Sequence, residues 1–571
     1  MNDVIRVHLN TGEISREPVS ADCKWVAGRA LTSRIVAEEV DPQCDVFGAG
    51  NKLVFATGLF AGTTVSCANR LSIGGKSPLT GGIKESNSGG NVAYRMARLG
   101  IRAIVFESVP STDTLQILHV SKDSISLVSG EEYRGMKTYE TAAKLRQQYG
   151  SQTAISLIGP TGERLSLASG IANTDNEGRP GRFAARGGLG ALMGSKGIKA
   201  VVINDSGAQG PDIADMERFK ALRSTIAKEI AGNETVANTY TKYGTAGMVN
   251  VTSALGALPT MNFSRGRFQH AEAINGDALY QRIVERGGDG DPSHSCMPGC
   301  VMRCSNVFAD ENGQEIVSPL EYETIGLVGS NCGIGDLDVI GKLNYRCNDL
   351  GLDTIDLGGA IGIAMETGLL PFGDGEGALK LLDEIEQDTW LGRILASGGQ
   401  RTGDILGARR IPAVKKQIMA AYDPRAVKGL GVTYATSPMG ADHTAGQTVR
   451  EPVEHASADN QVETSRRAQI TNTMHDSIGT CVFLSTGISK KFQLLADLTT
   501  AIHGKDCQLE DLHQIARETL LRERSFNRQA GLGEGSDRLP EFFYQEVNPD
   551  SGTVFDVPEE EMKKIYQFDG E

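Results

Sequence analysis

The chain has 571 residues, of which 40% are hydrophobic and 22% are charged, a composition typical of a folded protein that excludes extensive disorder. A single hydrophobic core stops growing at roughly 250–300 residues, so the length predicts two or three domains. The formal net charge of −14 argues against nucleic-acid binding, for which a basic face supplies most of the affinity.

No apolar stretch reaches the ~18 residues that a membrane-spanning helix needs, so no membrane insertion is expected. The chain opens without a basic segment followed by an apolar one, and this start predicts a cytoplasmic protein. In that compartment the ten cysteines are expected to be metal ligands or buried thiols rather than disulfides.

The first part of the chain carries strand signals. Residues 4–9 form a short β-like run closed by Asn10-Thr11-Gly12, residues 115–120 and 125–128 predict a hairpin, and residues 200–203 predict a buried strand. After residue 206 the spacing of apolar residues becomes helical, and Met216, Phe219, Ile226 and Ile230 fall on one helical face. We therefore expect an α+β fold with a sheet-rich domain (1–205) and two mainly helical domains (206–412 and 413–571).

Three cysteines, Cys296, Cys300 and Cys304, lie within nine residues and indicate a metal site. Structural zinc usually needs a second ligand pair, which is missing, whereas a [4Fe–4S] cluster with one remote cysteine fits better. Pro298-Gly299 is expected to break any helix between the first two ligands. The cysteines scattered singly are predicted to be small buried hydrophobes: Cys23, Cys44, Cys67, Cys332, Cys347 and Cys507.

Glycine is unusually frequent, with 69 residues in short clusters such as Gly81-Gly82, Gly89-Gly90 and Gly187-Gly188. Neither the P-loop spacing nor the dinucleotide-binding spacing is met. The density still suits backbone N–H groups that face an anionic, phosphate-bearing cofactor.

Four segments together resemble the aldehyde ferredoxin oxidoreductases. They are residues 76–82 (KSPLTGG), 187–196 (GGLGALMGSK), 321–331 (from Glu321-Tyr322-Glu323 to Gly329-Ser330-Asn331) and 348–353 (NDLGLD). The resemblance runs in register to about residue 525. It implies tungsten or molybdenum between two pterins at the junction of the three domains, beside a [4Fe–4S] cluster that passes electrons to ferredoxin.

The resemblance also implies site residues. Cys481 becomes the fourth cluster ligand. Two short stretches would contact one pterin each, the first through Asn348, Gly351, Leu352 and Asp353 and the second through Asp476, Gly479 and Thr480. Arg70 matches a basic residue between cluster and pterin. Asn87 matches one half of a Mg²⁺ site that bridges the pterin phosphates, and Ala185 and Arg186 match the other half.

This chain departs from the family pattern at three places. The first gap between the clustered cysteines has three residues where two are usual, Asn348 replaces an aspartate, and Thr480 replaces a leucine. An asparagine can still accept a hydrogen bond from a pterin N–H, but without charge.

Two residues match the catalytic positions of the family. Glu323 is expected to take a proton from water or orient the attacking oxygen, and His443 to hydrogen-bond the substrate carbonyl. Some relatives bridge a dimer through a metal on Glu-x-x-His. Here Glu510 and His513 have that spacing at a different place in the chain, and we expect them to lie on a solvent-exposed helix face.

The predicted reaction is oxidation of an aldehyde to a carboxylic acid, with electrons leaving to a ferredoxin-like carrier or an iron–sulfur subunit. Two alternatives stay open: a low-potential reductase subunit of a larger complex, and a non-catalytic scaffold that binds zinc. A homodimer or a hetero-complex is compatible with either enzyme.

Overall fold

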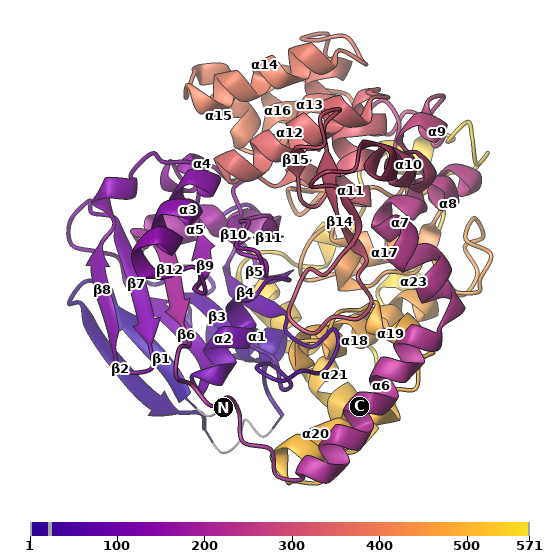
Figure 1. The fold of residues 1–571 in the computed structure, drawn as a ribbon. Helices are drawn as coiled ribbons and strands as arrows, with labels where there is room; N and C mark the ends of the chain where they lie inside the picture. Colours follow the sequence, from indigo (N-terminus) through magenta and orange to yellow (C-terminus); the bar gives the residue numbers. More distant parts are fainter. Residues whose placement is uncertain (1–2, 21–24, 569–571) are drawn as a thin grey trace.

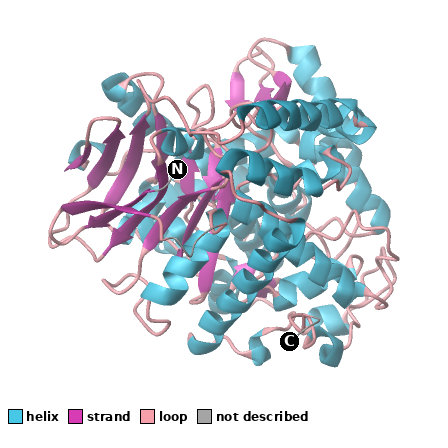
Figure 2. Ribbon diagram, turned by 90° about the horizontal axis from the view of Figure 1, so that it is seen from below, coloured by secondary structure: helices cyan, strands magenta, loops and turns pink. Residues whose placement is uncertain are grey.

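The computed structural model describes residues 3–20 and 25–568 (Figure 1). A sheet-rich part comes first and a mainly helical part follows, which confirms the predicted α+β arrangement. The strands gather on one side of the molecule and the helices fill the other (Figure 2). In the described residues we find no helix that is long and apolar enough to cross a bilayer. Cys23 lies outside these residues.

The first sheet has six strands in the order β2-β1-β6-β3-β4-β5. Their bounds are β1 Asp3–His8, β2 Glu13–Pro18, β3 Leu53–Thr57, β4 Leu71–Lys76, β5 Ile83–Ser88 and β6 Ile101–Glu107. Side chains alternate along a strand, so Leu53 and Phe55 pack into one apolar layer while Val54 and Ala56 pack into another. The second of these layers is covered by α1 (Gly28–Glu39).

The second sheet has the order β11-β10-β9-β12-β7-β8. Its strands are β7 Gln116–Ser121, β8 Ile125–Ser129, β9 Ala154–Leu157, β10 Ile171–Asn173, β11 Arg182–Ala184 and β12 Ile198–Asn204. The predicted hairpin and buried strand are confirmed as β7–β8 and β12. Leu118 and Ile203 share one core with Phe55 and Phe106, so the two sheets meet across an apolar layer.

Short helices connect these strands: α2 Val92–Arg98, α3 Thr138–Tyr149, α4 Pro160–Glu163 and α5 Leu189–Ser195. The helical part then contains α6 Met216–Gly232, α7 Thr241–Tyr243, α8 Met248–Leu255, α9 Ala271–Ile274, α10 Gly276–Arg286, α11 Tyr322–Thr324, α12 Leu337–Leu350, α13 Thr354–Glu366, α14 Gly375–Glu386, α15 Trp390–Ala396, α16 Gly399–Leu406, α17 Lys428–Thr436, α18 Gln461–Ile478, α19 Leu484–Gly487, α20 Gln493–His503, α21 Leu509–Gln529, α22 Phe542–Gln545 and α23 Glu559–Met562.

Helix α6 carries the apolar face that its sequence predicts. Phe219, Ile226 and Ile230 are buried in a core shared with α20, whereas Met216, the first helical residue, is 45% exposed. The packing of α6 against α20 joins the segments that the sequence assigned to two helical domains. The boundaries at residues 205 and 412 stay predictions.

The mainly helical part also contains short strands that the sequence did not predict. A three-stranded sheet is formed by β13 Asp291–His294, β14 Ser305–Ala309 and β15 Glu315–Val317, and a small hairpin by β16 Ala413–Val414 and β17 Gln417–Ile418. Residues 295–304, the cysteine loop, connect β13 to β14. Pro298-Gly299 lies in this loop with Gly299 at φ +76°, so it shapes a turn rather than interrupting a helix.

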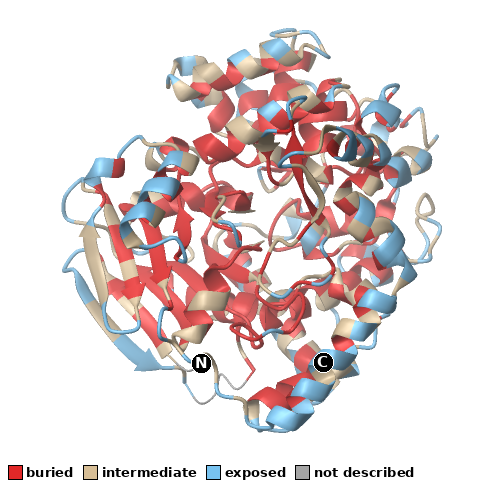
Figure 3. Cartoon of the chain, in the orientation of Figure 1, coloured by how far each residue is buried: buried red, intermediate tan, exposed pale blue. Residues whose placement is uncertain are grey.

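Two long helices end against the backbone of the sheet-rich part. A Cβ atom on Gly58 would lie 2.3 Å from Gly479 Cα just beyond α18, and one on Gly159 would lie 2.2 Å from the Leu350 carbonyl oxygen at the end of α12. Such approaches leave no room for a side chain. Figure 3 shows that the segments between the two parts of the molecule are largely buried. These contacts fix two helix ends at the same inner surface.

We expect Gly58→Ala to lower the free energy of unfolding by about 2 kcal/mol or more, because the added methyl group overpacks a backbone contact. The matched control is Gly232→Ala, since a Cβ atom there meets nothing within 4 Å. We expect that change to be neutral or to stabilise by less than about 1 kcal/mol. Denaturant midpoints measure both, and equal midpoints would contradict the close approach.

Candidate functional site

The end of α12 forms one half of the site. Gly351 caps the helix at φ +86°, and Asp353 then caps the start of α13 by accepting a hydrogen bond from the Ile355 N–H (2.9 Å). The other carboxylate oxygen of Asp353 lies 3.4 Å from Arg186 Nε. Burial raises the pKa of Asp353, against the effect of Arg186. Asn348 and Leu352 are buried beside them.

The end of α18 repeats this arrangement. Gly479 caps it at φ +75°, and Asp476 in its last turn lies 3.4 Å from the guanidinium of Arg29. Thr480 shares a hydrogen bond of 2.7 Å with His475. Burial raises the pKa of Asp476 to about 6.

The remaining residues implied for the cofactor come from the sheet-rich part. On β5, Asn87 accepts hydrogen bonds from Arg70 through its side-chain and backbone oxygens. The Arg186 N–H donates to Ser86 on the same strand (3.3 Å), and this bond places Ala185 and Arg186 beside β5. The structure therefore brings both halves of the predicted Mg²⁺ region to one strand.

Sequence reasoning missed several charged residues in this region. Lys84 Nζ and Asp442 Oδ2 form a buried ion pair of 2.7 Å. Burial by itself would raise the pKa of Asp442, but the positive charges of Lys84 and Arg186 hold this pKa below its usual range. Burial and the Asp476 carboxylate raise the pKa of Glu85 to about 8. A signal existed for Lys84 and Glu85, because they lie within three residues of the Gly81-Gly82 pair.

Arg186 also carries polar atoms that suit an absent ligand. Its Nη1 and both amide atoms of Gln417 are buried without a hydrogen-bond partner, whereas its Nε has only the 3.4 Å ion pair with Asp353 Oδ2. Arg186 Nη2 donates to the backbone oxygens of Ile418 and Ala441, so these atoms belong to one region. Buried polar groups are normally satisfied, and leaving one unpaired costs about 1–3 kcal/mol. The residues present therefore fit a polar cofactor such as a pterin.

The predicted cluster cysteines belong to one apolar neighbourhood. Cys296, Cys300, Cys304 and Cys481 all pack into or against the same core, although Cys481 is far away in sequence. The charges of the other three thiols contribute to the raised pKa of Cys304, after burial itself. Cys67 joins them, because its Sγ lies 3.6 Å from Cys300 Sγ.

The electrostatics of these thiols suit a cation. Burial raises the pKa of Cys296 to about 12 and also raises that of Cys481, while Arg70 acts in the opposite direction on both. Metal ligation requires thiolates, and iron or zinc would supply the compensating positive charge. Four thiols that belong to one apolar core fit a metal cluster.

Glu323 and His443, the predicted catalytic pair, lie next to each other. Glu323 Oε1 is 3.3 Å from His443 Nε2, and Glu323 Oε2 accepts a hydrogen bond from the Ala421 N–H (2.8 Å). Their side chains are 18% and 20% exposed, so both border a partly open space. Glu323 lies in α11, directly before a π-helical stretch over residues 325–329.

Aromatic side chains surround this pair. Tyr322, Tyr422 and Tyr434 are buried, and the Tyr422 ring centroid lies 5.9 Å from that of His443. Burial and the neighbouring Glu323 carboxylate raise the pKa of each phenol well above its ordinary value. These neutral rings form an apolar wall that the sequence did not reveal.

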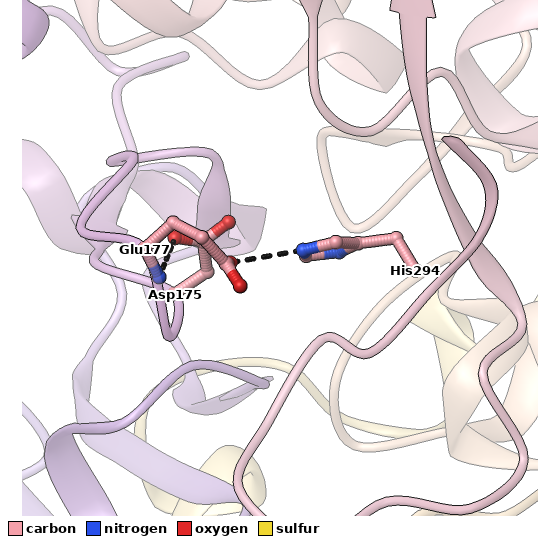
Figure 4. A group of neighbouring side chains, drawn as sticks. All are labelled: Asp175, Glu177 and His294. Atoms are coloured by element: carbon pink, nitrogen blue, oxygen red, sulfur yellow. Dashed lines mark hydrogen bonds and ion pairs between the residues drawn. The ribbon is translucent and has the colours of Figure 1, made fainter. Parts of the chain in front are cut away.

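A further polar group links the cysteine loop to the sheet-rich part. Asp175 and Glu177 follow β10, and the His294 ring at the end of β13 points toward Glu177 (Figure 4). Arg182 donates to His294 Nδ1 (3.2 Å), so His294 Nε2 carries the hydrogen that it donates to Glu177 (2.9 Å). Arg179 Nη1 already lies 3.5 Å and 3.3 Å from the two carboxylates. These ion pairs and hydrogen bonds connect β13 to the segment after β10, and because the carboxylates are already paired with Arg179, the group does not suit a metal ion.

The Glu-x-x-His spacing in α21 lies on the surface. The Glu510 side chain is 69% exposed and forms ion pairs with His513 and Arg517. This is the solvated helix face that the sequence predicts.

Comparisons with known proteins define the family. The model of the N-terminal domain of aldehyde ferredoxin oxidoreductase matches residues 4–205, and the model of its domains 2 and 3 matches residues 221–570. The chain is 31% identical to the tungsten-containing aldehyde ferredoxin oxidoreductases of Pyrococcus furiosus and Thermococcus kodakarensis, over 96% of its own length and 92% of theirs. It is an oxidoreductase, and it belongs to the aldehyde ferredoxin oxidoreductase family.

More distant likenesses extend the comparison. The WOR-like subunit of the aliphatic sulfonate oxidoreductase of Pyrococcus furiosus is 26% identical over 78% of this chain and 74% of that protein. The active site complex BamBC of benzoyl coenzyme A reductase shares the fold, with a TM-score of 0.82 over 99% of this chain and 93% of that one, at 20% identity. Membership in a family of oxidoreductases leaves the zinc-scaffold hypothesis without support.

Proposed function

We propose that this protein oxidises an aldehyde with water: RCHO + H2O → RCOOH + 2 H⁺ + 2 e⁻. The observation that carries the proposal is the contact between Glu323 and His443 beside the buried cofactor region. The names of the relatives that share most of the chain support the same reaction class. The substrate is an aldehyde of unspecified chain, and the electrons leave to a ferredoxin-like carrier.

The cofactor in this proposal is tungsten or molybdenum bound by two pterins. Asn348 to Asp353 with Arg186 would hold one pterin, and Asp476 to Thr480 with Arg70 the other, since carboxylate and amide oxygens accept from pterin N–H groups. Asn87 and the backbone of Ala185 would hold the Mg²⁺ at the phosphates. When bound, the metal–pterin group accepts the two electrons of the reaction.

The side chains of the protein divide the remaining work. Glu323 Oε2 is fixed by the Ala421 N–H, which leaves Oε1 to accept a proton from the attacking water. His443 Nε2 donates a hydrogen bond to the aldehyde oxygen and polarises the carbonyl. The buried phenols of Tyr322, Tyr422 and Tyr434 keep bulk water from this space, which strengthens both interactions.

Cys296, Cys300, Cys304 and Cys481 would hold a [4Fe–4S] cluster that transfers the electrons singly. The Arg70 N–H donates to the carbonyl oxygen of Gly479, just beyond the Asp476 helix end (3.1 Å), and this contact supports a position of Arg70 between the cysteines and that helix end. The cysteine loop also reaches the surface, where Val301 is 43% exposed. A carrier that contacts this loop would lie close to the cluster.

Elemental analysis of anaerobically purified protein tests the proposal. We expect about four irons and about one tungsten or molybdenum per chain, together with aldehyde-dependent reduction of a viologen dye. Zinc in place of iron, without tungsten or molybdenum, would exclude the proposed chemistry.

A second candidate is a reductase subunit that works at low potential within a larger complex. The similarity to a subunit of the sulfonate oxidoreductase favours it. Iron–sulfur or flavin proteins that co-purify with the chain, combined with slow aldehyde oxidation, would select this candidate.

A further inference from the structure

Cys67 lies in the loop of residues 58–70, which connects β3 to β4. It is 1% exposed, and its backbone has φ +64°, a left-handed conformation that residues other than glycine rarely adopt. Strained residues of this kind persist where the surrounding structure over-determines them, and they concentrate at functional sites. The sequence predicts only a small buried hydrophobe at this position.

The contacts of Cys67 reach both parts of the proposed ligand set. Its Sγ lies 3.6 Å from Cys300 Sγ, and its carbonyl oxygen accepts a hydrogen bond from the Cys481 N–H (2.8 Å). The neighbouring Ser66 hydroxyl accepts from the Val301 N–H (3.0 Å). The loop between β3 and β4 therefore contacts both the cysteine loop and the distant Cys481.

Five thiols thus share a region in which a cubane cluster needs four. Thiolates that bind neighbouring irons diverge from the corners of the cube, so two sulfur atoms in van der Waals contact cannot serve two corners. Either Cys300 or Cys67 binds iron, and Cys300 lies in the loop that already supplies Cys296 and Cys304. Cys67 then remains a thiol, and its Sγ lies within hydrogen-bond distance of the ligand sulfur (3.6 Å) and of the Ser66 hydroxyl (3.5 Å).

We propose that Cys67 is a positioning residue that donates an S–H···S hydrogen bond to the cluster ligand Cys300. This inference rests on the [4Fe–4S] cluster of the proposed function. Hydrogen bonds to ligand sulfurs stabilise the extra negative charge of the reduced cluster and so raise its reduction potential. Cys67 would thereby make the cluster a better acceptor for electrons from the active site.

Three variants of the full-length holoprotein test this role. Cys67→Ala removes the donor, and Cys67→Gly removes it while relieving the left-handed backbone, so a folded variant without the donor is available. Cys67→Ser keeps an O–H donor. The control is Cys507→Ala, which removes another buried thiol of the same core.

The readouts are iron content per chain and the midpoint potential of the cluster, followed by EPR during a redox titration. We expect the Ala and Gly variants to keep their iron and to show a more negative midpoint. We expect the Ser variant to return toward the wild-type value and Cys507→Ala to leave it unchanged.

Two results would overturn the inference while the proposed function stands. One is a wild-type midpoint in folded Cys67→Ala and Cys67→Gly, which shows that no hydrogen bond of consequence exists. The other is loss of iron from these folded variants, which makes Cys67 a ligand. A wild-type protein that contains no iron–sulfur cluster would overturn the proposed function together with this inference.

Discussion

Replacing Cys304 with serine is expected to remove most of the iron and to lower dye-linked aldehyde oxidation by about 100-fold or more. The reason is chemical: a serine hydroxyl is not deprotonated where a thiol can be, so one corner of the cluster loses its ligand. Changes to residues that only support metal ligands cost about 10–100-fold, so losing a ligand should cost at least as much. Iron analysis and steady-state kinetics measure the two effects.

The matched control for this prediction is Cys507→Ser, which changes a buried cysteine of the same apolar core outside the proposed ligand set. It should keep its iron and most of its activity. Full activity with unchanged iron in Cys304→Ser would remove this residue from the ligand set.

Changing Glu323 to glutamine is expected to lower kcat by about 10²–10⁴-fold while iron, tungsten or molybdenum stay bound. Glutamine can still accept the hydrogen bond from the Ala421 N–H through its amide oxygen, so the local structure should persist. The amide cannot take a proton from water, so the loss should appear in kcat rather than in KM.

The carboxylate of Glu510 supplies the comparison, because it is 69% exposed on α21. Glu510→Gln should leave kcat within about twofold, as expected for a surface change. A Glu323→Gln enzyme with wild-type kcat would show that this carboxylate takes no part in the reaction.

Local sequence patterns locate four of the strands in the sheet-rich part. Residues 4–9, 115–120, 125–128 and 200–203 match β1, β7, β8 and β12 to within a few residues, because period-2 patterns and turn residues are local signals. The strands β2 to β6 and β9 to β11 were covered only by the general expectation of a sheet-rich domain. The strands β13 to β17 were missed, since each is only two to five residues long and carries no clear period.

The site residues also fall into two groups, those that the sequence locates and those that it does not. Residues within ordered motifs, such as Glu323 and Cys481, can be located because the resemblance supplies their partners. The buried pairs Arg29–Glu523 and Lys84–Asp442 cannot, because their members are 494 and 358 residues apart and neither leaves a local pattern. Cys67 was judged correctly as buried, but its contact with Cys300 depends on a fold that no spacing reveals.

The inner surface where Gly58 meets Gly479 and Gly159 meets Gly351 has a consequence for biosynthesis. Its two sides come from distant parts of the chain, so this surface is complete only after translation has passed Gly479. Insertion of the proposed metal–pterin group is therefore expected to follow synthesis of most of the polypeptide, because a chain that ends before Gly479 lacks one side of this surface.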